Sequence, residues 1–142
     1  LLFYGRRFHD LYDDNFKAAS LPFPEAEFFH NQASRRLSAE KDGPLWVFSS
    51  LFPAVISGHR AEVMLDRKVA ALRVIEALRL HAGVKEQLPG SLEAVEVKLA
   101  PIPLDPYTGK PFEYRLDKDR ATLVGPAPQE AFRLEYRLTL TK

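Results

Sequence analysis

The feature that most constrains this fold is an uninterrupted helical stretch, Ala61–Ala82 (AEVMLDRKVAALRVIEALRLHA). It contains neither proline nor glycine, and Gly83 follows directly, so the pattern predicts one helix that Gly83 ends in a left-handed cap. At about 100° per residue, its charges gather on one narrow arc instead of half the surface. The arc consists of Glu62, Asp66, Arg73 and Glu76.

Apolar side chains cover most of the rest of this helix: Val63, Met64, Ala70, Ala71, Val74, Ile75, Leu78 and Ala82, with Leu65 and Leu72 beside the charged arc. A helix this apolar needs cover from more than one side. We therefore expect it to be the central element, and truncation of Leu72 or Ile75 to be as costly as loss of any buried aliphatic side chain.

The residues before this helix also predict helices. Apolar residues spaced by three and four predict an amphipathic helix over Leu1–Ala19, with Phe16 on its apolar face. A second helix is expected from Pro24, which suits a first helical turn, to about Ala39. We expect it to bury three apolar side chains, Phe28, Phe29 and Leu37.

The longest uncharged run is Gly43–Gly58 (GPLWVFSSLFPAVISG). It is shorter than the roughly 20 residues that span a bilayer, and it contains two prolines. Contact with a membrane interface through Trp46, Phe48 and Phe52 is one interpretation, and burial against the central helix is the favoured one. We expect a break at Ser57-Gly58, and membrane contact only indirectly or through a missing segment.

After Gly83 the hydrophobic period changes from helical to alternating. Ser91 is expected to cap a short helical turn, and strict alternation then predicts strands around Phe112–Asp117, Ala121–Gly125 and Phe132–Thr141. Short links between them predict an antiparallel meander of three to four strands, with its apolar face on the central helix. The predicted class is α+β.

The predicted organisation is a single domain over residues 1–142. Its parts are a helical segment (1–58), the central helix (59–83), and a loop with the sheet (84–142). Because the chain starts at Leu1 instead of Met, we expect it to be a portion of a longer protein.

The loop DPYTGKPF has the chemistry of a tight turn: Asp105, Pro106, Gly109 and Pro111. Gly109 is expected to take a positive φ. Tyr107 and Lys110 lie at the tip, where an aromatic and a cation suit a contact surface; alternatively, Tyr107 folds back onto the sheet.

The last strand is expected to have one neighbour only, which leaves its other edge open to a partner. The candidate interaction residues are therefore Tyr107, Thr108, Lys110, Arg133, Glu135 and Arg137.

The C-terminal half resembles the globular region of type II secretion major pseudopilins over roughly residues 70–125. The resemblance lies in the helix end Arg73–Ala82, the segment LPGSL (Leu88–Leu92) and the loop PLDPYTGKPFEY (Pro103–Tyr114). It implies a long helix followed by a small antiparallel sheet, in a protein of the bacterial cell envelope. The sequence of this loop is also similar to C-terminal regions of uncharacterised proteins from Planctomycetes-type bacteria.

Pseudopilins also carry an apolar, membrane-embedded N-terminal half-helix and bind calcium through acidic residues in the late sheet loops. Asp117 and Asp119 lie near that region, but the D-G and D-D signatures are missing, so the resemblance implies no calcium site here.

Other chemistry is weakly represented. The formal net charge is +1, from 20 basic and 19 acidic residues, and the basic residues form no stripe, which argues against nucleic acid. The sequence has no cysteine and no G-x-S-x-G motif, which argues against nucleophilic catalysis by a cysteine or serine. The spacing Glu27-x-x-His30 is that of di-iron bundles, and His59, Glu62 and Asp66 share a helix face, but the second E-x-x-H pair is missing.

We therefore expect no cofactor and no catalytic residues. The interpretation is a non-enzymatic interaction or scaffold domain of a bacterial, envelope-associated protein or assembly, whose partner is another protein or the upstream part of the same protein. Two alternatives remain: a helical metal-binding or oxidoreductase domain using Glu27, His30, His59, Glu62 and Asp66, and a regulatory appendage of an upstream enzyme.

Overall fold

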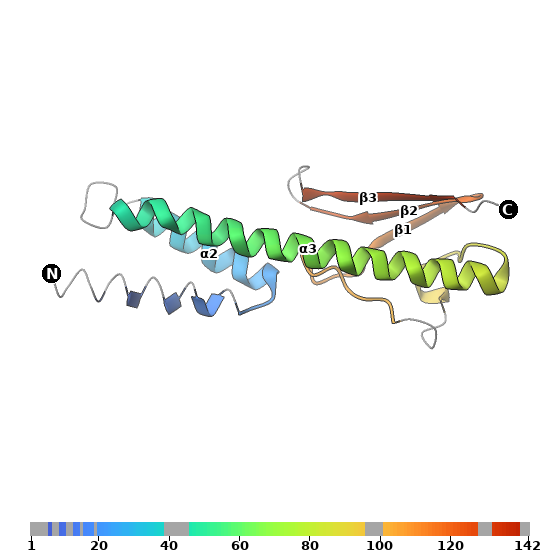
Figure 1. Cartoon of the computed structure of the whole chain (residues 1–142), viewed down its shortest axis with the longest axis horizontal. Helices are drawn as coiled ribbons and strands as arrows, with labels where there is room; N and C mark the ends of the chain where they lie inside the picture. Colours follow the sequence, from blue (N-terminus) through green and yellow to red (C-terminus); the bar gives the residue numbers. More distant parts are fainter. Residues whose placement is uncertain are drawn as a thin grey trace. The chain divides into compact units, whose positions relative to one another are not determined.

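The computed structural model describes residues 6, 9–10, 13–14, 16–18, 20–38, 46–95, 101–127 and 132–139, apart from the side chains of 37, 38 and 46–52. The protein is α+β (Figure 1). Its elements are α2 (Phe23–Ser38), α3 (Trp46–Lys85), the 3₁₀ helix η1 (Leu92–Ala94), β1 (Glu113–Asp117), β2 (Arg120–Gly125) and β3 (Leu134–Thr139). The described residues between 6 and 18 are helical as well.

The chain divides into two compact units, unit 1 (Leu1–Val63) and unit 2 (Met64–Lys142). The division lies inside α3, so the two halves of this helix belong to different units. Each unit is described by itself.

The helix α3 is longer than the sequence predicted. It is continuous through Ser57-Gly58, so the predicted break there is wrong, and it contains Pro53 even though proline lacks the N–H that a helix interior uses. Within the described part of the chain, no helix is both long and apolar enough to cross a membrane. The alternatives predicted for Trp46, Phe48 and Phe52 concern side chains outside the described ones.

The C-terminal end of α3 also differs from the prediction. Gly83 lies inside the helix, and Glu86 takes the left-handed conformation with φ 58°. The N–H of Glu86 donates to the carbonyl of Ala82 at 2.8 Å, which is the bond of an αL termination. The helix therefore continues past the residue best suited to end it, because a single glycine costs only about 1 kcal/mol in a helix interior.

In unit 1, α2 lies beside the N-terminal part of α3 (Figure 1). The buried face of α2 is formed by residues spaced by three and four: Phe23, Ala26, His30 and Ala33. The predicted burial of Phe28 and Phe29 is wrong, since these side chains are 64% and 41% exposed, and Phe16 is also exposed. The buried face therefore carries two alanines and a histidine beside one phenylalanine, and Phe28 and Phe29 lie on the other side of the helix. The side chain of Leu37 lies outside the described ones.

Unit 2 contains the predicted meander, and this prediction is confirmed. The sheet order is β1-β2-β3 with both pairs antiparallel, and Leu123 of the central strand lies opposite Tyr114 on one side and Tyr136 on the other. The sheet packs on the unit 2 part of α3. The core of this packing is Ala70, Ala71, Val74, Ile75, Ala77, Leu78, Leu92, Val95, Phe112 and Leu123.

Only one face of α3 is buried in unit 2, so the expectation of cover from more than one side is wrong. An apolar stripe remains exposed by between 46% and 62%, and it consists of Leu65, Val69, Leu72 and Leu80. The buried face is rich in alanine, and Leu92, Val95, Phe112 and Leu123 pack on this side of the helix. Among the described residues of unit 2, no strand or loop covers the opposite side in the same way.

We predict that Ile75→Ala and Leu72→Ala differ sharply in stability, although the sequence treats both as buried. Ile75 is 8% exposed and Leu72 is 55% exposed. Ile75→Ala should lower the free energy of unfolding by about 2–5 kcal/mol, because it leaves a cavity in the core. Leu72→Ala, measured on protein dilute enough to be monomeric, should change it by no more than about 0.5 kcal/mol. Urea unfolding followed by circular dichroism measures both, and equal losses would contradict the one-sided burial of α3.

Candidate functional site

The most constrained polar group in unit 2 is the guanidinium of Arg67, which projects from α3. Its side chain and that of Asp105 are both fully buried. Arg67 Nε donates to Asp105 Oδ1 at 2.8 Å, and Nη2 donates to Oδ2 at 2.7 Å, which is the strong bidentate geometry of an arginine–carboxylate pair. Nη1 donates to the carbonyl of Phe132, and Nη2 to that of Pro126 at 2.7 Å.

These bonds connect α3 to three segments that are distant in sequence: the DPYTGKPF turn, the chain just after β2, and the chain just before β3. Gly125, at the end of β2, makes the close approach possible. A Cβ at this position would lie 2.8 Å from Arg67 Nη2, so any larger residue would displace the guanidinium. The cluster around Arg67 therefore fixes how the sheet is placed on this part of the helix.

The DPYTGKPF turn closes around the same aspartate. The N–H of Gly109 donates to the Asp105 carbonyl at 2.8 Å, and the N–H of Asp105 donates to the Lys110 carbonyl at 2.8 Å. Asp105 Oδ1 also accepts the N–H of Tyr107 at 2.9 Å. Gly109 has φ 67°, which confirms the predicted positive φ.

Tyr107 was one of the predicted interaction residues, with a second interpretation in which it folds back. The structure supports the second: Tyr107 is only 5% exposed. The Arg67 guanidinium carbon lies 4.8 Å from the centre of its ring, a cation–π distance, and the Phe132 ring lies 6.3 Å away. The predicted exposed contact at Tyr107 is therefore wrong, because the ring covers the buried ion pair.

The other predicted interaction residues lie on or near the surface. Lys110 is exposed, and Thr108 is half-buried with its Oγ1 accepting the N–H of Lys110 at 3.3 Å. On β3, Glu135 accepts from Arg137 at 3.0 Å and from Arg133 at 3.4 Å. These three side chains form a charged ladder along the outer face of β3. Exposed pairs of this kind contribute little to stability.

The sequence interpretation missed Arg67, which it treated as one of several scattered basic residues. A signal was present, since Arg67 lies on the apolar side of α3, four residues after Val63 and three before Ala70. A lone cation in an apolar helical face is rarely buried without a partner. It should therefore have prompted a search for a carboxylate in the loops.

The residues of the metal alternative are only partly brought together. In unit 1, His30 Nε2 and His59 Nδ1 lie 3.0 Å apart, a hydrogen bond between two imidazoles, and His30 is 2% exposed. Glu27 pairs instead with Arg60, with 3.6 Å between Glu27 Oε1 and Arg60 Nη2. Glu62 and Asp66 are exposed. Among the described residues, no group of three or more histidines and carboxylates is arranged to hold a metal ion.

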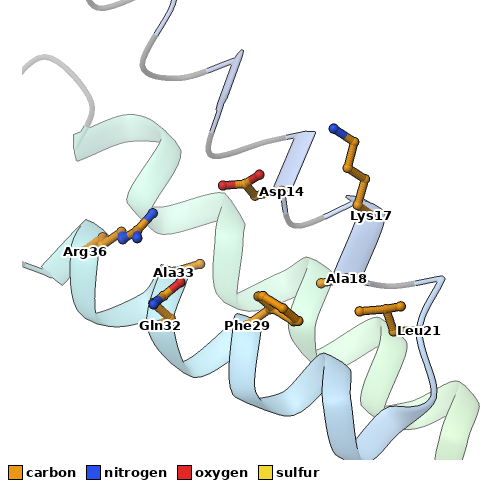
Figure 2. Close-up of a pocket in the computed structure, with 8 residues that line it drawn as sticks. All are labelled: Asp14, Lys17, Ala18, Leu21, Phe29, Gln32, Ala33 and Arg36. Carbon is orange, nitrogen blue, oxygen red and sulfur yellow. The ribbon is translucent and has the colours of Figure 1, made fainter.

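A cavity of about 290 Å³ lies in unit 1, between the described helical residues 13–14 and 16–18 and α2 (Figure 2). Ala18, Leu21 and Phe29 form its apolar end, and Arg36 lies toward the other. Asp14 and Lys17 on its rim carry opposite charges, and Lys17 already donates to Asp13 at 2.6 Å. The cavity thus has no consistent charge preference and indicates no particular ligand.

We predict that Asp105→Asn destabilises the protein by about 3–5 kcal/mol, because it leaves the buried guanidinium of Arg67 without a compensating charge. The double variant Arg67→Met/Asp105→Leu should lose much less stability than the summed losses of the single variants Arg67→Met and Asp105→Leu. The reason is that the double variant buries no charge. Thermal and urea unfolding measure these differences. Additive losses in the double variant would show that the two side chains do not act as a pair.

We also predict a pH dependence that depends on His30. Burial, and then the positive charges of His59 and Arg60, hold the pKa of His30 below its usual value of 6.5. The unfolded chain therefore takes up a proton here at a higher pH than the folded chain does. The contribution of His30 to stability is complete above about pH 6.5 and is lost as the pH falls below it.

The test is the free energy of unfolding from about pH 7.5 to about pH 5.5. His30→Gln should flatten the decline on the acid side, because glutamine can hydrogen-bond but does not titrate there. His9→Gln, at an exposed position, serves as the control. If the free energy of unfolding of His30→Gln falls with decreasing pH as steeply as that of the natural sequence, His30 is not the group responsible.

Comparison with known proteins does not place this chain in a family. No protein-family model matches it. No curated protein and no solved structure shows significant similarity to it. The resemblance of LPGSL and DPYTGKPF to pseudopilin segments stays a prediction.

Proposed function

We propose that this chain is a non-enzymatic interaction or scaffold domain within a bacterial, envelope-associated protein or assembly. The observation that supports this proposal is the apolar stripe of α3. Leu65, Val69 and Leu72 follow one another at intervals of four and three residues, so their side chains lie on one face of the helix. Contiguous exposed apolar surface of this kind marks interaction sites in soluble proteins.

The energetics favour a partner at this surface. Removing apolar area from water is worth roughly 25 cal/mol per Å², and the side chains of the stripe are about half exposed or more. Anchors at i, i+4 and i+7 are also the pattern by which a helix docks against another helix or into a groove. The stripe is carried by a long helix whose opposite face is fixed in the unit 2 core, so it is held rigidly.

The edge of β3 is a second candidate surface. Among the described strands, β3 pairs only with β2, so its outer edge offers backbone groups for strand addition. However, exposed charges such as Arg133, Glu135 and Arg137 are a common way for proteins to protect an edge strand from pairing. The apolar stripe is therefore the better-supported surface.

The bacterial and envelope parts of the proposal are supported by the resemblance of Leu88–Leu92 and Pro103–Tyr114 to pseudopilin segments. That resemblance also supports a role in an assembly instead of in catalysis. The partner class is a protein or another part of the same polypeptide.

We predict that Leu72→Asp in the natural full-length protein abolishes its native complexes while the fold is retained. Leu72 is largely exposed, so an aspartate there costs the monomer little, but it would be desolvated in an interface. Native mass determination and circular dichroism measure the two effects.

The matched control is Phe28→Asp, an apolar side chain on α2 that is 64% exposed and lies outside the stripe. Complexes that survive Leu72→Asp unchanged would sink the proposed function. Loss in both variants would show a general effect of added charge.

A further inference from the structure

We infer that the partner of the apolar stripe is a second copy of this chain, bound with the two α3 helices antiparallel. This inference rests on the proposed function and specifies its partner. Leu65, Val69 and Leu72 have the spacing of a coiled-coil seam, at intervals of four and three residues, and Glu76 takes the next seam position. Val74 and Leu78, on the opposite face of α3, are in the core, so the seam faces outward.

The charges beside the stripe favour self-pairing. Asp66 and Arg73 are both exposed and lie two helical turns apart on the same flank of the stripe. A two-fold axis near the middle of Val69–Leu72 places Asp66 of one copy beside Arg73 of the other. Symmetry repeats the pair, so each dimer would contain two such contacts. The surface is therefore complementary to itself.

The same axis gives an apolar centre. Val69 of one copy faces Leu72 of the other, and this contact also occurs twice. Leu65 is then placed opposite Glu76, the charged residue that lies between Leu72 and Leu80 on the same face of the helix. In the structure Glu76 accepts a bond from Arg79 at 2.9 Å, so its charge is already partly compensated.

A parallel arrangement is disfavoured by the same residues. In parallel register, the two Glu76 side chains would face each other in the seam. Lys68 of one copy would also lie next to Arg73 of the other, at the flanking positions that set the orientation of coiled coils. Both contacts join like charges, whereas the antiparallel arrangement separates them. Charge complementarity thus selects both the occupant and its direction.

The first test is sedimentation of the full protein over a concentration series. We expect a monomer–dimer equilibrium for the natural sequence. Asp66→Arg and Arg73→Asp should each weaken it by about tenfold, since two flanking pairs become repulsive, and the combined exchange Asp66→Arg/Arg73→Asp should restore it. Asp119→Arg, in the exposed β1–β2 turn, makes the same change in charge and should have no effect.

The second test determines direction. The chain contains no cysteine, so single cysteines can be introduced without interference. Val69→Cys lies near the proposed axis and should be joined to its counterpart by a short bismaleimide. Leu80→Cys should not be joined, because the two copies of this residue would be about 28 Å apart at 1.5 Å per residue. Joining at both positions would overturn the antiparallel arrangement.

A monomer at every concentration up to the solubility limit would refute self-pairing. If Leu72→Asp still disrupts the native complexes in that case, the proposed function stands and the stripe binds a different protein. If neither self-association nor any native complex depends on Leu72, both proposals fail. A dimer that is insensitive to all the charge reversals would contradict the assigned surface.

Discussion

The packing of unit 2 depends on one buried ion pair, Arg67 with Asp105. Burying two charges is costly, and the cost is offset only when geometry and hydrogen bonding are nearly complete. Here the carboxylate accepts from two guanidinium nitrogens and from a backbone N–H, while the guanidinium also reaches two carbonyls. Each of these partners comes from a segment that must be in place before the pair is satisfied. The pair therefore makes the loop conformations and the placement of the sheet interdependent.

This dependence explains several details at once. Gly125 must lack a side chain because the guanidinium lies against it, and Tyr107 must fold inward because its ring covers the charge. The turn from Asp105 to Lys110 closes on the same carboxylate and sets the direction in which β1 begins. A loop that looked suited to contact with a partner is thus occupied in holding the fold together.

The helix α3 combines two apolar faces with different roles. Alanines and the branched residues Val74 and Ile75 form the buried face, where the loops and strands approach closely. The opposite face carries larger aliphatic side chains that stay about half exposed or more. In unit 1, by contrast, the polar pair His30 and His59 lies where α2 meets α3. In unit 2 this helix therefore holds the sheet with one face and leaves the other face exposed.

The sequence by itself determined the local features. Alternation predicted the strands, glycine at the turn predicted the positive φ of Gly109, and short links predicted the meander, because each depends on residues close together in the chain. Only the tertiary structure decided which face of each helix is covered. Periodicity shows that Leu72 and Ile75 are apolar and that Phe28 and Ala26 lie on different faces, but not where a neighbour is found. The partner of Arg67 is likewise 38 positions away, and only folding brings the two charges together.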